Sequence, residues 1–415
     1  MMKLLKLNRE RLKPRLRVAA SLVLLVSLSG IQVCAAPSPQ SLLLKQPIEN
    51  VAALDGLYQS LARTQAASTD EAALTRILHY GDSHVAADGL TGALRNHFQR
   101  EFGNAGSGFL YAARPWDWYV RTGVTQAASA GWRVDGLKLA ALPFDNQLGI
   151  AGLSFTATRA GERLQISAPG ERFEFALLQQ PGAGAVEIWL DGQLYRHTPE
   201  LAALSLNAPE AATLFVPVEA EHAGTHTLEL RIVTASPVRV FGLIAERAQS
   251  GVIYDAFGIN GARATRPLLW DWQLLDEQLA QRAPALIVIA YGSNEAGDAD
   301  LNLAVYRRDF AELLQRFQHA APEASLLVIA PPDRAQFING RWQPLRELPV
   351  VIEAQRQAAR ANGAAFWDLQ RAMGGAGSIN RWVGQRLAQT DHVHLTAAGY
   401  RLVADALYEA LTTDH

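Results

Sequence analysis

The second half of the chain repeats a strand-then-helix pattern, and this pattern limits its possible folds more than any other feature. Short apolar runs with the length and composition of buried strands occur at 252–257, 286–290, 326–330 and 364–368. Stretches with helical spacing of apolar residues follow them, near 266–282, 303–319, 346–361 and 396–412. Strands that alternate with helices in this way predict an α/β protein with a parallel sheet and helices on both of its faces.

A further strand is predicted far upstream, at 74–80, and helical spacing of apolar residues follows it at 88–102. Together the five strands predict a flavodoxin-like α/β/α sandwich. The segment Gly81-Asp82-Ser83-His84 connects the upstream strand to its helix. Ser83 is therefore expected at the carboxyl end of a parallel strand, where open α/β sheets build their sites.

Between these two parts, from about 145 to 246, the pattern changes to short runs in which apolar and polar residues alternate. Such runs lie at 163–167, 172–177, 186–190 and 225–232, and Asp191-Gly192 is a favourable hairpin turn. This spacing predicts an inserted β-sandwich, or jelly roll, of about 100 residues. The α/β domain is accordingly predicted in two parts, at 36–144 and 247–415, with the insert at 145–246.

The amino terminus predicts export. Seven basic residues precede an apolar stretch at 18–33 that ends in small residues, which is the order found in a secretory signal peptide. We expect residues 1–35 to be this signal and the mature protein to be periplasmic or secreted, with no stable membrane insertion after cleavage. A retained membrane anchor is the alternative, although Ser27, Ser29 and Gly30 interrupt the apolar stretch. Cys34 is the only cysteine of the chain, so we expect no disulfide in the mature protein.

Charge and motif content exclude several classes of function. Without residues 1–35 the chain has 31 basic and 39 acidic side chains, a net charge of −8. This charge argues against nucleic acid or an anionic membrane surface as a partner. No Cys/His cluster or HExxH spacing indicates a metal site, and no GxxxxGK[ST] segment indicates a nucleotide site. We therefore expect neither a metal nor a cofactor.

Ser83 and the segment Asp391-His392-Val393-His394 supply the hydroxyl, imidazole and carboxylate of a serine hydrolase. The Asp-x-x-His spacing lets Asp391 hold one ring nitrogen of His394 while the other nitrogen faces a partner. Gly261 and Asn294 follow two of the predicted strands. A backbone N–H and a side-chain amide there are suitable donors to the negative oxygen of a tetrahedral intermediate.

Each of these features also has a structural interpretation. A Gly-Asp-Ser run is an ordinary turn sequence, and Asp391 can cap the helix that follows Thr396. The same three catalytic groups also occur in α/β-hydrolases, but those need a GxSxG elbow and an Asp well upstream of the His. Ser83 lies in no such elbow, and Asp391 is three residues before His394.

The four segments that contain Ser83, Gly261, Asn294 and Asp391–His394 resemble, in this order, the four sequence blocks of the SGNH (GDSL-type) hydrolases. The resemblance implies Ser83 as nucleophile, His394 as general base and Asp391 as the group that orients it. It also implies an oxyanion hole made by the N–H groups of Ser83 and Gly261 and by the Asn294 amide. Glu295 follows the asparagine where the family usually has Asp, a change that removes no catalytic group.

With its predicted export and inserted β-sandwich, the chain resembles the peptidoglycan O-acetylesterases, in which the sandwich resembles a carbohydrate-binding module. This resemblance implies removal of acetyl groups from the 6-hydroxyl of muramic acid residues, with O-acetylated peptidoglycan as the partner. A lipid esterase, a thioesterase or a polysaccharide O-acetyltransferase of the same fold remains open. So does a non-catalytic carbohydrate-binding protein of the cell wall.

Four residues are candidates for the substrate groove: His84, Trp116, Trp118 and Trp189. His84 replaces the Leu usual in the first block, and we expect it to be a pocket-wall or packing residue and not the base, because adjacent residues on a turn rarely reach the same proton. Trp116 and Trp118 lie in one aromatic cluster, which walls the groove or packs the insert on the core. Trp189 is placed on the polar face of its strand, where its ring stacks on a sugar or lies partly covered at the rim.

Overall fold

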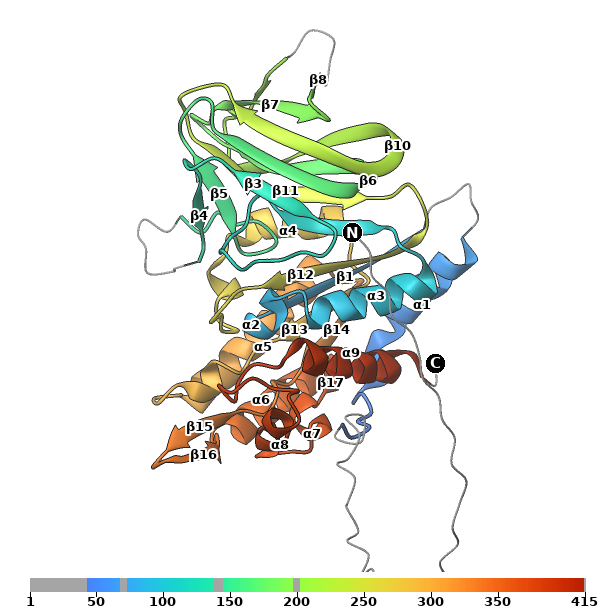
Figure 1. The fold of residues 1–415 in the computed structure, drawn as a ribbon, viewed down its shortest axis with the longest axis vertical. Coiled ribbons are helices and arrows are strands. Elements are labelled where there is room, and N and C mark those ends of the chain that lie inside the picture. Colours follow the sequence, from blue (N-terminus) through green and yellow to red (C-terminus); the bar gives the residue numbers. More distant parts are fainter. Residues whose placement is uncertain (1–42, 68–72, 138–144, 197–201, 414–415) are drawn as a thin grey trace, which may run out of the picture. The chain divides into compact units, whose positions relative to one another are not determined.

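The computed structural model describes residues 43–67, 73–137, 145–196 and 202–413. Five parallel strands form one sheet in the order β12-β1-β13-β14-β17 (Figure 1). Their bounds are β1 Leu74–Gly81, β12 Gly251–Gly258, β13 Leu286–Ala290, β14 Ser325–Ile329 and β17 Ala365–Trp367. The predicted five-stranded sheet with the flavodoxin-like strand order is therefore confirmed.

Helices cover both faces of this sheet. The helices are α1 Asp55–Ala66, α3 Leu90–Phe102, α4 Trp272–Arg282, α5 Leu303–Ala320, α6 Leu348–Ala361 and α9 Ala397–Thr412. The strand β13 shows how the faces divide: Leu286 and Val288 pack in one apolar cluster with α1, α3 and α9, whereas Ile287 and Ile289 pack in another with α4, α5 and α6. Each strand is thus buried from both sides, as parallel sheets require.

Three short helices and one helix start refine the prediction. The stretch predicted as one helix at 88–102 is preceded by a separate turn, α2 Ser83–Ala86, whose N-terminus is capped by the Asp82 side chain. The helix predicted from 266 begins only at Trp272, because Asp271 accepts hydrogen bonds from the N–H groups of Gln273 and Leu274. Two further short helices, α7 Leu369–Ala372 and α8 Ser378–Gly384, precede the last loop.

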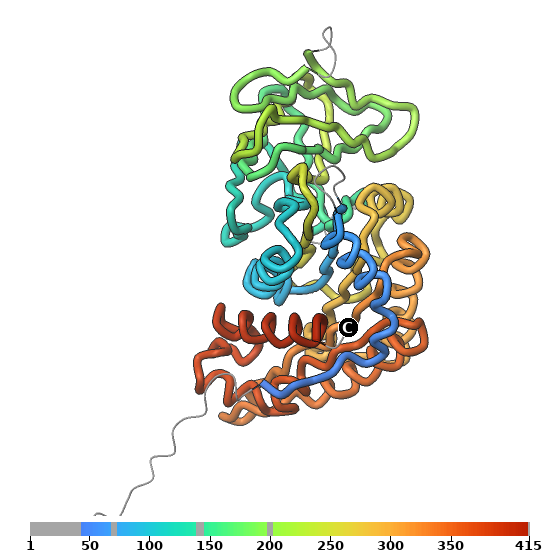
Figure 2. The backbone as a smooth tube through the Cα atoms, turned by 90° about the vertical axis from the view of Figure 1, so that its right-hand side faces the viewer, coloured from blue at the N-terminus to red at the C-terminus, as the bar shows by residue number. Residues whose placement is uncertain are grey.

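An antiparallel sheet of ten strands lies between β1 and β12 in the chain. Its strands are β2 Gly106–Tyr111, β3 Thr125–Ala128, β4 Arg133–Asp135, β5 Ser154–Ala157, β6 Arg163–Gln179, β7 Ala185–Leu190, β8 Gln193–Tyr195, β9 Leu204–Ser205, β10 Ala212–Ile232 and β11 Val238–Glu246. Figure 2 shows the green to yellow-green part of this sheet gathered apart from the blue and red segments of the chain. The position and antiparallel character of this sheet agree with the predicted insert.

The insert differs from its prediction in two respects. The runs at 163–167 and 172–177 are one long strand, β6, which pairs with β10 along both halves of their length. Three strands of the sheet, β2 to β4, precede residue 145. The strands β3 and β4 are four and three residues long and have no buried residue, so they show no alternation of buried apolar residues. The ten strands hydrogen-bond as one continuous sheet, and the two facing sheets of a jelly roll stay a prediction.

The hairpin turn predicted at Asp191-Gly192 joins β7 and β8, where Leu190 pairs with Gln193. Both turn residues have positive φ, 49° at Asp191 and 79° at Gly192. This is the backbone that a two-residue turn of the favoured type needs, and Gly adopts it without steric cost.

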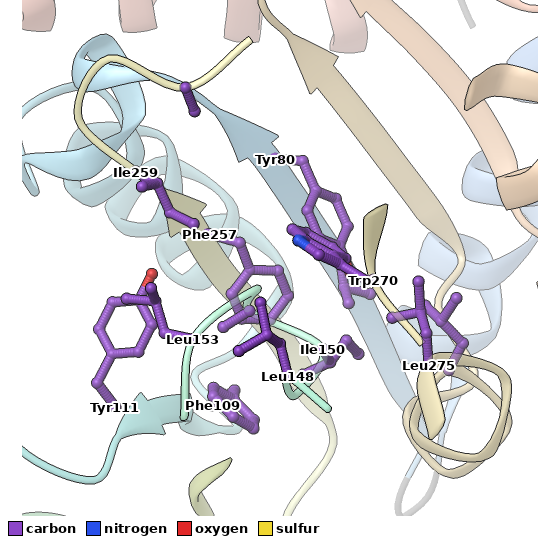
Figure 3. Close-up of a cluster of buried hydrophobic side chains, with 14 of the residues drawn as sticks. Tyr80, Phe109, Tyr111, Leu148, Ile150, Leu153, Phe257, Ile259, Trp270 and Leu275 are labelled. Atoms are coloured by element: carbon purple, nitrogen blue, oxygen red, sulfur yellow. The ribbon is translucent and has the colours of Figure 1, made fainter. Parts of the chain in front are cut away.

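The two sheets share an apolar core, which Figure 3 shows in close-up. Phe109 of β2 meets the ring of Phe257 of β12 edge-on at 5.5 Å, and Tyr80 of β1 lies 5.0 Å from the same ring. Trp270 closes the cluster so tightly that a Cβ at Gly152 would lie 2.2 Å from its ring. The insert is therefore packed directly on β1 and β12, the strands that carry two of the predicted site segments.

A buried ion network reinforces this junction. Arg282 of α4 pairs with Asp255 of β12 at 2.8 Å and with Glu246 of β11 at 2.6 Å, and Arg76 of β1 pairs with Glu246 at 3.1 Å. The Asp255 carboxylate also accepts the N–H of Phe109 at 2.7 Å. Because a buried charge without partners is strongly destabilising, this network favours one arrangement of β1, β11, β12 and α4.

The predicted signal peptide, residues 1–35 with Cys34, lies outside the described residues. In the part of the chain that the structure describes, no helix has the length and apolar character needed to cross a bilayer.

Candidate active site

Ser83 is the first residue of α2, directly after β1. The turn that presents it is tight, since a Cβ on Gly81 would lie 2.4 Å from the Val85 side chain and 2.7 Å from the carbonyl oxygen of Ala290. Only glycine fits there. The Asp82 carboxylate accepts the N–H of His84 at 2.9 Å and so fixes the start of the helix. Ser83 thus lies at the carboxyl end of β1, as the sequence predicts.

The loop before α9 brings an imidazole and a carboxylate to this serine. The Ser83 Oγ lies 2.9 Å from His394 Nε2, and His394 Nδ1 lies 2.7 Å from Asp391 Oδ2. An ionised carboxylate only accepts hydrogen bonds, so Nδ1 carries the proton and Nε2 accepts from the serine hydroxyl. The structure therefore places Ser83, His394 and Asp391 in one hydrogen-bonded chain, although 308 positions separate Ser83 from Asp391 in the sequence.

Asp391 is held for this contact by its own loop. Its Oδ1 accepts the N–H groups of Val393 at 2.9 Å and of His394 at 3.0 Å. Partial burial acts to raise the pKa of Asp391, but the hydrogen bonds from the His394 ring and from the two N–H groups outweigh it and hold this pKa below its usual value. The alternative role of Asp391 as the cap of α9 is wrong, because the Thr396 hydroxyl accepts the N–H of Gly399 and caps that helix.

The two predicted donor segments lie beside Ser83. Asn294 follows β13, and its Nδ2 donates to the carbonyl oxygen of Ala262 at 2.9 Å and lies 3.5 Å from Asp82 Oδ2. Gly261 is exposed and has a φ of 70°, in the left-handed region. The Asn294 amide therefore connects the turn before Ser83 to the loop of Gly261.

Glu295 and Arg334 take part in this site, although the sequence assigns a role to neither. The buried Glu295 carboxylate accepts the N–H groups of Ala264 at 2.7 Å and Gly292 at 3.1 Å, and so ties together the loops of Gly261 and Asn294. Arg334, after β14, donates to the carbonyl oxygen of Ser293. Its position after a predicted parallel strand is the one signal that could have indicated it.

Two buried carboxyl groups lie next to the site. Burial, with a smaller contribution from nearby Glu295, raises the pKa of Asp82 to about 7 despite the hydrogen bond from the His84 N–H. Burial likewise raises the pKa of Glu295. Asp82 therefore changes its charge near neutral pH at a place adjacent to Ser83.

His84 is a packing residue and does not line an open groove. Its side chain is 6% exposed, and its Nδ1 lies 2.9 Å from the Tyr400 hydroxyl of α9. Burial lowers its pKa to about 3, so the ring is neutral at physiological pH. Of the two predicted roles, the structure agrees with packing and contradicts the groove, because the His84 side chain is buried and its ring lies 5.4 Å from that of His394.

The three tryptophans differ in their surroundings. Trp116 is half-buried against Tyr111 and Tyr119, so it packs on the core. Trp118 is 55% exposed, and its ring centre lies 5.4 Å from that of Trp116. Its neighbours Tyr119 and Val120 line a small cavity together with residues of α2 and Gly258, and Trp118 remains a candidate for the groove.

Trp189 does not belong to this site. It lies on β7, and Figure 1 shows this strand at the end of the antiparallel sheet remote from α2. The Arg231 guanidinium lies 3.8 Å from the centre of the Trp189 ring, and the ring Nε1 donates to Glu187. Of the two alternatives for Trp189, the structure shows the partly covered ring. The strand alternation carries no information on the distance to Ser83.

Within the described ranges, no group of His, Cys, Asp or Glu is arranged to hold a metal ion. The serine, imidazole and carboxylate, with adjacent N–H donors, form a geometry that is suited to acyl transfer through a serine.

The GDSL-like lipase/acylhydrolase family model matches residues 234–402. This region holds Gly261, Asn294, Asp391 and His394, so the match confirms the resemblance to the GDSL-type hydrolases. The matched part of the chain is similar to GDSL-like lipases and acylhydrolases, and with the five-stranded α/β fold it supports a carboxylic ester hydrolase.

Among solved structures, a peptidoglycan O-acetylesterase aligns with a TM-score of 0.71 and 24% identity, over 89% of this chain and 98% of that one. At this identity the likeness shows the fold. An acetyl xylan esterase aligns with a TM-score of 0.31 and 20% identity, over 38% of this chain and 80% of that one. A family two carbohydrate esterase from Cellvibrio japonicus aligns with a TM-score of 0.28 and 12% identity, over 69% of this chain and 97% of that one. No curated protein matches the sequence.

Proposed function

We propose that this protein is an exported serine esterase that removes O-acetyl groups from a cell-wall polysaccharide. Its proposed substrate is peptidoglycan acetylated on the 6-hydroxyl of muramic acid. The observation that carries the chemistry is the hydrogen-bonded chain from Ser83 through His394 to Asp391 at the carboxyl end of β1. The substrate is supported by the similarity of fold, over 89% of the chain, to a peptidoglycan O-acetylesterase. The proposed location rests on the signal-like order of residues 1–35.

In the proposed mechanism, Ser83 Oγ attacks the acetyl carbonyl carbon while His394 Nε2 takes the hydroxyl proton. The carbonyl oxygen becomes an anion, for which the N–H groups of Ser83 and Gly261 and the Asn294 amide are the proposed donors. His394 then gives its proton to the sugar oxygen as the C–O bond breaks. A water gives a proton to His394 and attacks the acetyl-serine; as the bond between the carbonyl carbon and Ser83 Oγ breaks, His394 returns the proton to Oγ and acetate is released. Asp391 holds the ring and stabilises the imidazolium in both halves of the reaction.

The substrate is tested by acetate release from purified, O-acetylated peptidoglycan. We expect the wild-type enzyme to release acetate from this material and to hydrolyse long-chain p-nitrophenyl esters far more slowly than the acetyl ester. The same peptidoglycan after chemical de-O-acetylation is the matched control for the substrate. Rapid hydrolysis of the long-chain esters without acetate release would contradict the proposal and favour a lipid esterase. Transfer of acetyl groups to added glycan in place of their release would favour the acetyltransferase.

Replacing Asn294 with alanine tests the proposed oxyanion hole. We expect kcat on p-nitrophenyl acetate to fall about 10²-fold or more, because the negative oxygen loses one preorganised donor. The Asn294 amide also contacts Ala262, so thermal unfolding must be measured to separate loss of the donor from movement of the Gly261 loop. A fall in kcat with an unchanged KM and melting temperature supports the role. Activity within threefold of wild type would rule it out.

A further inference from the structure

A hairpin near the site exposes two large aromatic rings. It consists of β15 Ala335–Ile338 and β16 Arg341–Pro344, joined by a turn in which Asn339 and Gly340 have φ of 51° and 76°. Phe337 pairs directly with Trp342 across the hairpin, and their ring centres lie 5.2 Å apart. Phe337 is 61% exposed and Trp342 36%. Two large apolar rings placed side by side in solvent indicate a binding surface.

The hairpin is attached to the loop of the proposed base. The ring of Trp342 stacks on that of His392, with 3.8 Å between the centres and 17° between the planes. The N–H of Ala335 donates to the carbonyl oxygen of His392 at 3.0 Å. His392 lies between Asp391 and His394 in the chain, so the aromatic pair contacts the loop that carries both. Figure 1 shows the hairpin at the same end of the parallel sheet as α2, which begins with Ser83.

The stack also explains an unusual backbone. His392 has a φ of 56°, which is uncommon for a residue with a side chain, and only 7% of this residue is exposed. Strained residues persist when their surroundings fix them. Trp342 covers the histidine ring with one face, which leaves its edge and the Phe337 ring for a ligand.

The exposed polar groups at the turn beside the two rings favour a sugar over a lipid. Asn339 and Arg341 are exposed at the turn end of the hairpin, next to the Phe337–Trp342 pair, and offer an amide and a guanidinium group, whereas Gln336 and Gln343 pair with each other on the opposite face. A pyranose ring offers C–H groups on its face, which pack on an aromatic ring, and hydroxyl groups at its edge, which bond to such donors. An acyl chain would need a longer apolar surface than two rings beside a polar turn provide.

We propose that Phe337 and Trp342 form a saccharide subsite. It stacks on a pyranose ring next to the sugar that carries the acetyl ester, and so selects glycan esters over small esters. The subsite rests on the proposed function, because it assumes that the ester is part of a glycan. In this role the hairpin recognises the glycan part of the substrate, whereas Ser83 reacts with its acetyl group.

The test replaces Phe337 with alanine, since this ring contacts Trp342 and leaves the Trp342–His392 stack in place. We expect kcat/KM on O-acetylated peptidoglycan fragments to fall about tenfold through a higher KM, the loss expected for one aromatic contact and its buried area. Activity on p-nitrophenyl acetate should stay within twofold of wild type. Trp189→Ala, which removes an aromatic ring of the insert, is the matched control and should leave the activity on both substrates unchanged.

A competition measurement separates this subsite from the proposed function. De-O-acetylated fragments of peptidoglycan, and of xylan, are added as inhibitors of p-nitrophenyl acetate hydrolysis. We expect a fragment to inhibit the wild-type enzyme and its inhibition constant to rise about tenfold in Phe337→Ala. If only xylan fragments behave in this way and the wall material releases no acetate, the proposed function fails and the subsite stands. The subsite is overturned if no fragment inhibits the wild type, or if Phe337→Ala changes neither the KM for the peptidoglycan fragments nor the inhibition constant. It is also overturned if Trp189→Ala raises these constants more than Phe337→Ala does.

Discussion

Replacing Ser83 with alanine is expected to lower kcat on p-nitrophenyl acetate by about 10⁴-fold or more. Alanine offers no oxygen from which His394 Nε2 can take a proton, so no acyl-enzyme forms. The oxyanion donors and substrate binding remain, and they alone support only a small residual rate over the uncatalysed reaction. The same variant should release no measurable acetate from O-acetylated peptidoglycan.

The fold should survive this change. The cap of α2 is the Asp82 carboxylate, and the hydrogen bond of the Ser83 side chain goes to His394. We therefore expect the free energy of unfolding to change by less than about 1 kcal/mol. Ser293→Ala is a matched control, because its buried hydroxyl lies in the neighbouring segment before Asn294 and should be dispensable. Activity retained in Ser83→Ala and lost in Ser293→Ala would move the nucleophile to Ser293.

The parallel sheet is predictable because each of its strands is a short apolar run, and a stretch with helical spacing of apolar residues lies next to it. The strands are in register at their carboxyl ends, where Gly81 of β1 aligns with Gly258 of β12 and with Ala290 of β13. Residues just after these ends must gather at one edge of the sheet. The order of strands and helices in the chain is therefore enough to group Ser83, Gly261 and Asn294.

The insert is less predictable, for a physical reason. Alternation identifies a strand with one buried face, and β6 and β10 have it over most of their length. The residues of β2 are buried throughout and those of β3 are mostly exposed, so neither strand alternates. Long strands also continue through Pro and Gly when a partner pairs with them, as β6 does at Pro169 and Gly170 opposite Thr225 and Gly224.

Side-chain contacts between distant segments cannot be predicted in this way. In the sequence Glu295 is only a replacement for Asp, yet its carboxylate joins the Gly261 and Asn294 loops. Trp342 and His392 are 50 positions apart, and nothing in either segment indicates that their rings stack. The same limit applies to Trp189, whose strand face follows from the alternation but whose covering by Arg231 and distance from α2 do not.

Replacing Asp391 with asparagine is expected to lower kcat on p-nitrophenyl acetate by about 10³-fold, which corresponds to about 4 kcal/mol. The Asn Oδ1 can still accept the N–H groups of Val393 and His394, so the loop keeps its shape. The NH₂ group of the asparagine would donate a hydrogen bond to His394 Nδ1. The ring would then accept at Nδ1 and carry its proton on Nε2. An imidazole in this tautomer cannot take the Ser83 proton.

The size of this effect depends on exposure. A fully buried carboxylate in this position is worth about 10⁴-fold, but the Asp391 side chain is 44% exposed, and solvent screens part of its interaction with the imidazolium. The tautomer effect needs no burial, so a large loss should remain.

Asp391→Ala is the matched comparison, because it removes the carboxylate without supplying a competing donor and leaves the tautomer free. If asparagine is the more harmful of the two at an equal melting temperature, Asp391 acts by fixing the tautomer of His394. If both variants keep more than a tenth of wild-type activity, Asp391 only caps its own loop, and the general base works without an orienting carboxylate.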